Sequence, residues 1–218
     1  AAVLIGIRIT AFASDRVWLA NRLPMEKSFE VLKADAREII EELGYAEPPK
    51  DVAASIQLDM VAYTRIAQNH DAPSLAEVIE QPNQALVTML YRQDTASIVP
   101  MQLGGKVTLF DPTPGPGDVT LRLDLNGKLN YLRAMPPRVD RSEEAAPATD
   151  WAKLFEVAGL DIAEFEPTAP TVQPLTFADE RAAWTGVLPH RDDLPVRVVA
   201  AALRGRPVFF ETVTPYDP

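Results

Sequence analysis

The chain offers few side chains for catalysis or metal binding. Its 218 residues include no cysteine and only two histidines, His70 and His190. The lack of cysteine excludes disulfides, thiolate nucleophiles and cysteine-bound zinc. Each half of the chain holds one histidine, which excludes a multi-histidine metal centre within a half. No Gly-x-Ser-x-Gly elbow supports a serine nucleophile, but a Ser-His-Asp triad stays open because its members can be distant in sequence. Local motifs therefore assign no metal ligand, cofactor or catalytic residue.

One tripeptide resembles part of a kinase site. His190-Arg191-Asp192 copies the start of the protein-kinase catalytic loop. That chemistry needs an Asn five residues after the Asp to hold Mg²⁺, and a later Asp-Phe-Gly. Here the fifth residue is Arg197, and the chain contains no Asp-Phe-Gly. A solvated turn is the better interpretation, and we expect no phosphotransfer by this chain.

Two further short motifs are incomplete. Gly104-Gly105-Lys106 has Pro100 and Val107 where a phosphate-binding loop needs Gly and Ser or Thr. Residues 124–127 look like a fragment of a calcium loop but lack the alternating acidic ligands and the closing Glu. Both are predicted to be turns.

The chain is organised around a predicted β-hairpin at Asp118–Pro137. Asn126-Gly127 is the strongest short signal for a two-residue type I′ turn. The stretch Pro195–Pro215 is a looser copy, again with a two-residue turn and a proline stop. Folding the first hairpin about its turn pairs Leu123 with Asn130, Leu121 with Leu132 and Val119 with Ala134 on the face toward a core.

The opposite face of the first hairpin is the predicted binding face. It carries Arg122, Tyr131 and Arg133, which could bind a partner or an acidic ligand. The two arginines supply charge-assisted donors and the tyrosine a flat apolar surface. A solvent face with cation–π contacts is the competing interpretation.

The elements that support the hairpins predict an α+β fold. Helices are expected at Ser28–Gly44 and Asp150–Gly159, each with an N-cap residue and a glycine stop. Both halves run helix, glycine, proline-rich extension, strand, hairpin and proline. We therefore predict two helix-on-antiparallel-sheet units from a divergent tandem duplication. Further strands are predicted at Val52–Leu58, Ala85–Arg92 and Ala182–Leu188, and Trp151, Trp184, Phe209 and Phe210 are predicted core anchors.

The predicted units occupy most of the chain. Residues 26–137 form the first α+β unit, 138–149 a linker of proline, alanine and charge, and 150–218 the second unit. Residues 1–25 begin with Ala-Ala-Val-Leu-Ile-Gly-Ile and are either a first strand, centred on Val3–Phe12, or a membrane-proximal segment.

Composition narrows the class of partner. Hydrophobic residues make up 47% of the chain and charged residues 24%, as in an ordinary globular domain. The formal net charge of −10 repels phosphate backbones, so we expect no nucleic-acid partner.

Five segments together resemble a known region: RLPMEKSFEVLKADAREIIEELGY, VTLRLDLNGKLNYLRAMPP, DWAKLFEVAGLDIAEFEP, FADERAAWTGVLP and AAALRGRPVFFETVTP. They are similar to the non-kinase soluble region of multi-pass bacterial serine/threonine kinase-like membrane proteins, a domain of unassigned function. The resemblance implies a module between membrane helices on the extracytoplasmic side, tethered near its N-terminal end. It carries no known catalytic residue, so none is transferred.

Three functional classes follow. The first is an extracytoplasmic sensory or protein-interaction module without catalytic activity, binding an unknown protein or small molecule. The second is a small hydrolase or ligand-binding enzyme with a non-local site. The third is a structural subunit of a membrane-associated assembly. A polar cavity near His70 or His190 would favour the second class, and an exposed apolar or Arg/Tyr patch would favour the first.

Overall fold

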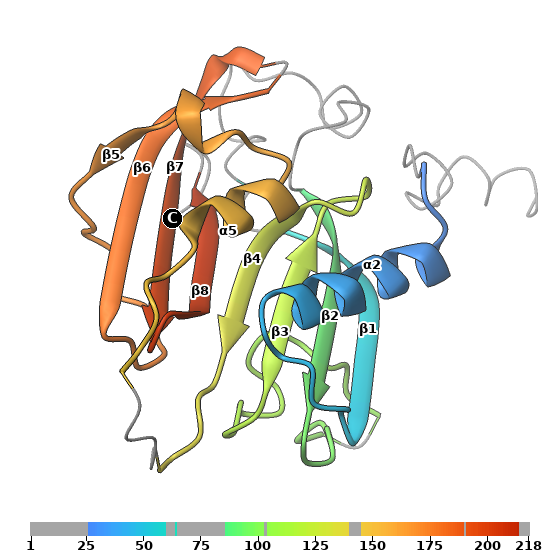
Figure 1. The fold of residues 1–218 in the computed structure, drawn as a ribbon. Helices are drawn as coiled ribbons and strands as arrows, with labels where there is room; N and C mark the ends of the chain where they lie inside the picture. The colour runs from blue at the N-terminus through green and yellow to red at the C-terminus, as the bar shows by residue number, and fades with distance from the viewer. Residues whose placement is uncertain are drawn as a thin grey trace, which may run out of the picture.

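A single antiparallel sheet of eight strands carries two α-helices on one face (Figure 1). The computed structural model describes residues 26–59, 64, 86–102, 104–139, 145–189 and 191–213. The predicted α+β class is confirmed. No helix among these residues is long and apolar enough to cross a bilayer.

The strand order joins the two halves of the chain edge to edge. The elements are α2 (Phe29–Glu42), β1 (Asp51–Leu58), β2 (Val87–Asp94), β3 (Val119–Leu123), β4 (Leu129–Ala134), α5 (Trp151–Val157), β5 (Glu166–Thr168), β6 (Glu180–Leu188), β7 (Arg191–Leu203) and β8 (Arg206–Val213). The sheet order is β1-β2-β3-β4-β8-β7-β6-β5. Each half thus contributes one helix and four consecutive strands. The expectation of a separate sheet for each unit is wrong, because β4 and β8 pair and so remove two open edges.

The two helices begin and end in the same way. Ser28 accepts a hydrogen bond from the Val31 amide, and Asp150 accepts one from the Lys153 amide. Each helix ends in a glycine with positive φ, +92° at Gly44 and +70° at Gly159. The next residue in each case donates its amide back into the last turn, which is the Schellman arrangement. Both predicted helices and their caps are confirmed.

The two hairpins differ at their turns. In the first, the Asp124 amide bonds to the Lys128 carbonyl, so the loop has three residues rather than two. Only its last residue, Gly127, has positive φ, whereas a type I′ turn needs two such residues. The second hairpin has the two-residue turn, with φ of +53° at Arg204 and +77° at Gly205.

Both hairpins carry a bulge at the same place. Leu121 pairs with Leu132 and Val119 with Ala134, as predicted. The predicted pair of Leu123 with Asn130 is wrong, because the register shifts and Leu123 pairs with Leu129. Asn130 is therefore the extra residue of the first hairpin. In the second hairpin Ala202 pairs with Pro207 and Ala201 with Phe209, which leaves Val208 extra. Asn130 and Val208 each lie three residues after the turn glycine.

The two halves join through the pairing of β4 with β8, which we call the seam, and this pairing is symmetric. Leu132 of β4 pairs with Phe210 of β8, and each lies five residues after its turn glycine (132 − 127 and 210 − 205). Tyr131 pairs with Glu211 and Arg133 with Phe209, so the two flanking pairs exchange under a two-fold rotation. The two hairpins therefore occupy equivalent positions in the β4–β8 pairing.

The C-terminal end of each helix contacts the hairpin of the other half. Gly44, after α2, lies against the side chain of Arg206 of the second hairpin. Gly159, after α5, lies against Lys128 of the first hairpin. Arg206 and Lys128 each follow their turn glycine directly. An ion pair of 3.4 Å between Lys153 Nζ and Glu42 Oε2 also joins the two helices.

The main core lies between the sheet and the helices. One continuous cluster runs from α2 across β3 and β4 to α5, and includes Leu32, Ile40, Leu121, Leu132, Phe155, Trp184 and Phe210. Of the predicted core anchors, Trp184 and Phe210 are buried here and Phe209 is buried on the other face. Trp151 is half-buried with its ring 5.8 Å from that of Trp184.

Some expectations fall outside the described residues. These are the N-terminal segment at residues 3–12 and both histidines, His70 and His190. The other predicted strands are confirmed as β1, β2 and β6, with bounds that differ by one or two residues.

Candidate functional site

Two loops cover the sheet face that is turned away from the helices. The first loop is residues 95–118, between β2 and β3, and the second loop is residues 169–179, between β5 and β6. Leu109 of the first loop and Val172 and Ala178 of the second pack against one cluster on the sheet, formed by Tyr131, Ala183, Val199, Ala201, Val208 and Phe209. The two loops thus meet the same patch of sheet.

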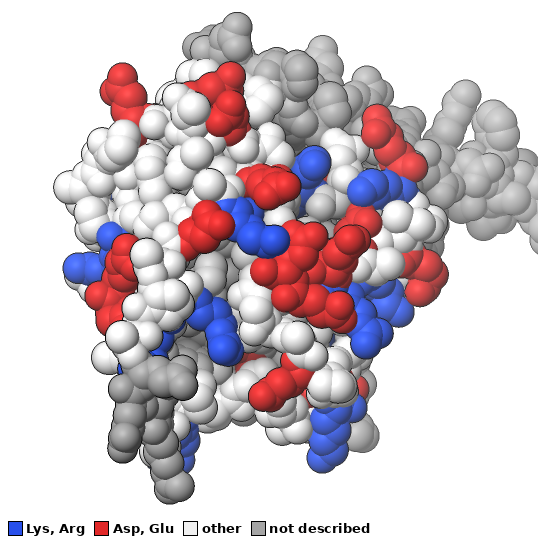
Figure 2. Space-filling view, in the orientation of Figure 1, with Lys and Arg blue, Asp and Glu red and all other residues white. Residues whose placement is uncertain are grey.

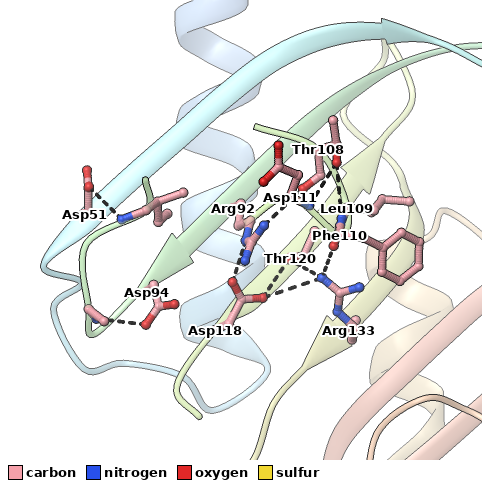
Figure 3. A network of polar contacts seen from close by, with 12 residues as sticks. Asp51, Arg92, Asp94, Thr108, Leu109, Phe110, Asp111, Asp118, Thr120 and Arg133 are labelled. Carbon is pink, nitrogen blue, oxygen red and sulfur yellow. Dashed lines mark hydrogen bonds and ion pairs between the residues drawn. The ribbon is translucent and has the colours of Figure 1, made fainter. Parts of the chain in front are cut away.

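A buried ion-pair network lies beneath the first loop (Figure 3). Arg92 Nε donates to Asp118 Oδ2 at 2.5 Å. Thr120 Oγ1 donates to Asp118 Oδ1 at 2.9 Å, and Arg133 Nη2 lies 3.7 Å from that oxygen. Arg92, Asp118, Thr120 and Arg133 are all almost fully buried. Arg92, Thr120 and Arg133 occupy one row across β2, β3 and β4, since the register pairs them in turn.

The same two arginines hold the loop backbone. Arg92 Nη1 donates to the Thr108 carbonyl at 3.1 Å, and Arg133 Nη2 donates to the Leu109 carbonyl. The guanidinium of Arg133 also lies 5.1 Å from the centre of the Phe110 ring. The loop segment 108–110 is therefore fixed to the sheet by side chains of β2 and β4.

The network has more positive than negative charge. Two guanidinium groups share the single carboxylate of Asp118. The carbonyls of Thr108 and Leu109 and the hydroxyl of Thr120 supply the other acceptors, and the buried Arg133 Nε has no hydrogen-bond partner. The network positions the loop, and loss of Asp118 would leave two buried guanidinium groups without a carboxylate.

The predicted binding face is mostly buried. Arg133 is 2% exposed within the network, and Tyr131 is buried beneath Arg122, whose guanidinium lies 4.8 Å from its ring. Arg122 itself lies 3.7 Å from Asp59 and 3.6 Å from Glu211. The expectation of a water-facing surface is wrong for Tyr131 and Arg133, because the loops cover that side of the sheet. Burial also raises the pKa of Tyr131 above its usual value, so its hydroxyl stays neutral.

Exposed apolar side chains gather on the outside of the loops. Among the described residues six large apolar side chains are more than half exposed, and five of them lie on the two loops. We name these five the apolar loop surface: Val99, Met101, Phe110, Leu175 and Phe177. Met101 is 80% exposed and Leu175 is 76% exposed. Large exposed apolar groups that cluster mark sites of protein or membrane contact.

The surface is anchored at several points. The Met101 amide donates to Asp111 Oδ1 at 2.9 Å, which ties together two parts of the first loop that are ten residues apart. Thr176, between Leu175 and Phe177, is buried and donates to the Ala134 carbonyl at the end of β4 at 2.8 Å. The apolar side chains therefore project from backbones that are held in place.

Sequence reasoning missed both the network and the apolar loop surface. One signal was present for the network: Arg92 is a charged residue in an otherwise apolar, β-rich segment, where burial requires a charged partner. No local signal named that partner, because Asp118 is 26 residues away and looked like the end of a loop.

The remaining motifs take ordinary places. Gly104 lies in a turn and residues 124–127 form the end of the first hairpin. Among the described residues, no group of three or more His, Asp or Glu side chains is placed to hold a metal ion.

Comparisons of this chain with protein-family models, with curated proteins and with solved structures return no match.

Proposed function

We propose that this chain is a sensory or protein-interaction module of a bacterial membrane signalling protein, without catalytic activity of its own. The observation that carries the proposal is the apolar loop surface, whose first loop is held on the sheet by the buried Arg92–Asp118–Arg133 network and whose second loop is held by Thr176. An exposed apolar patch was the feature expected to separate this class from the enzyme class. The resemblance to a region between membrane helices places the module on the extracytoplasmic side in this proposal.

The network suits a binding surface energetically. Binding loses affinity when loops must be ordered at the moment of contact. Here the loop segment 108–110 is bound to the sheet by arginine side chains before any partner arrives. Arg133 contacts Phe110, so a partner on the surface would act on β4 and hence on the seam between the two halves. In this proposal Arg122, Tyr131 and Arg133 support the binding surface from beneath.

A photo-crosslinking residue tests the surface directly. Placed at Met101 in the full-length protein in its own cells, it should give a discrete crosslinked product. Val139 provides the matched control, because it is also more than half exposed but lies outside the two loops. Equal products from both positions, or none from Met101, would contradict the proposed surface.

The compartment needs a separate test. Alkaline phosphatase fused after Pro218 in the full-length context should be active if the module is exported. Activity only from a cytoplasmic reporter at that position would refute the extracytoplasmic placement.

We also propose that the two halves are divergent tandem copies. Four features support this: the matching helix ends, the bulges at Asn130 and Val208, the seam centred on Leu132 and Phe210, and the reciprocal helix contacts. A two-fold seam is what an ancestral homodimer of one unit would have. A fragment of residues 26–137 should therefore dimerise through β4, with Leu132 facing its own copy. A folded fragment that stays monomeric at high concentration would count against the duplication.

A further inference from the structure

We infer that the apolar loop surface docks on the interface of a zwitterionic lipid bilayer, with Met101, Phe110, Leu175 and Phe177 entering the region below the headgroups. This inference deepens the proposed function, on which it rests, by assigning a chemical class to what the surface contacts. Three properties of the two loops carry it: their low content of charged side chains, their proline content and their fixed backbone.

Charge is scarce on the loops, although the chain as a whole has a net charge of −10. Residues 95–118 and 169–179 contain one lysine, Lys106, and three aspartates. Asp118 is buried with the arginines, Asp111 accepts from the Met101 amide, and Asp179 accepts from the Arg204 amide at 3.0 and 3.1 Å. Acidic side chains are instead conspicuous on the helix-covered face (Figure 2).

This distribution points to a neutral apolar partner. A charged partner would be recognised by several groups of the opposite sign, and the loops present only Lys106, the half-buried Asp111, and Asp179. The net charge of the chain also opposes docking on an anionic bilayer. A zwitterionic interface carries no net charge. It therefore needs no groups of opposite sign on the loops, and it does not repel the acidic chain.

Proline content favours lipid over protein as the occupant. The two loops contain six prolines: Pro100, Pro112, Pro114, Pro116, Pro170 and Pro174. Proline has no backbone N–H. Each proline therefore means one fewer N–H group that would have to give up its hydrogen bond to water when the loop enters lipid. A bilayer interior offers no replacement hydrogen bond, whereas a protein partner can offer one. A proline-rich loop therefore enters lipid at lower cost than an ordinary loop.

The fixed backbone allows the side chains to enter together. Phe110 is held over Arg133, and Thr176 holds Leu175 and Phe177 at the end of β4. Because Leu109 and Ala178 pack on one sheet cluster, the two loops cover adjoining parts of the same face. Both loops therefore carry their exposed apolar side chains over the sheet face that is turned away from the helices.

The test is sedimentation of the purified chain with phosphatidylcholine vesicles. The wild-type chain should bind, the binding should persist at high salt, and vesicles rich in phosphatidylglycerol should bind it more weakly. The double variant Met101→Asp/Leu175→Asp should lose at least about tenfold in partition, because two apolar anchors become charged. Val139→Asp adds one charge outside the surface and should bind like the wild type. All variants should keep the wild-type unfolding midpoint, since neither Met101 nor Leu175 contributes a side chain to the network.

The outcomes separate this inference from the proposed function. Failure of the wild-type chain to bind phosphatidylcholine, or equal binding by the double variant, would overturn lipid docking. A crosslinked protein at Met101 together with no vesicle binding would overturn it as well, and would leave the protein-interaction function standing. Loss of vesicle binding in the double variant alone would support it.

Discussion

On the sheet face turned away from the helices, β3 and β4 carry Thr120 paired with Arg133, where β7 and β8 carry Val199 paired with Glu211. The next pair is Arg122 with Tyr131 in the first half and Ala201 with Phe209 in the second. The backbone plan of the two hairpins is the same, down to the position of the bulge. This face is nevertheless largely polar in the first half and largely apolar in the second.

The difference shows two ways to cover a sheet. In the second half, loop side chains such as Val172 and Ala178 pack on apolar strands, an interaction with little directionality. In the first half, arginine donors are directed at the carbonyls of Thr108 and Leu109. Hydrogen bonds require a defined distance and angle, so they determine where the loop lies. The polar half is therefore the one suited to presenting a defined surface.

Removal of Asp118 should have the largest effect on this comparison. Asp118→Ala leaves Arg92 and Arg133 buried without a carboxylate, and should cost about 3–5 kcal/mol of unfolding free energy. Denaturant unfolding measures it. The triple change Arg92→Met, Asp118→Leu and Arg133→Met replaces the buried charges by apolar side chains, as on the same face of the second half. It should recover most of that stability. A stable Asp118→Ala variant would show that the network does not hold the fold.

The helix-facing positions should be destabilised by opposite changes of size, large to small in the first half and small to large in the second. Leu121 and Ala200 are equivalent, since they pair with Leu132 and Phe210. Leu121→Ala should cost about 2–5 kcal/mol, the usual range for a buried leucine. Ala200→Leu should cost about 1–3 kcal/mol through overpacking. If Leu121→Ala cost less than about 0.5 kcal/mol, the scale of neutral surface changes, the assignment of its face would be refuted.

The turns should differ in their tolerance of substitution. Gly127 has φ of +84°, and a Cβ there would also collide with the Asp35 carboxylate. Gly127→Ala should therefore cost at least about 1–2 kcal/mol. Arg204 already adopts φ of +53° with a side chain, so Arg204→Gly should change stability by less than about 1 kcal/mol. Thermal unfolding of the two variants gives the comparison, and equal losses would contradict it.

The smallest expected effect concerns pH. Tyr131 and Phe209 occupy equivalent positions, each four residues after its turn glycine. Only Tyr131 can ionise. Burial raises the pKa of Tyr131 above 10.0, so the folded state binds this proton more tightly than the unfolded state. Its contribution is complete below pH 10 and is lost as pH rises through the raised pKa. Tyr131→Phe should flatten part of the fall in stability above pH 10, and an unchanged alkaline profile would contradict this.

The sequence by itself determined the local elements. Ser28 and Gly44 mark the ends of α2, and Asp150 and Gly159 mark those of α5, because capping depends on residues three or four positions apart. Away from the turn, the alternation likewise determined which side chains of the first hairpin share a face, since strand side chains alternate with a period of two. Next to the turn it did not, because the bulge at Asn130 puts Leu129 beside Leu123 in the core.

Only the tertiary structure decided how the halves join and what is buried. The β4–β8 seam pairs residues about 80 positions apart, and nothing local in an open strand edge names its partner. The same holds for Arg133, whose strand position is polar in sequence but whose side chain is covered by a loop held through Asp118. Burial of a charged side chain depends on a distant counter-charge and a covering segment, and both are brought to it only by the fold.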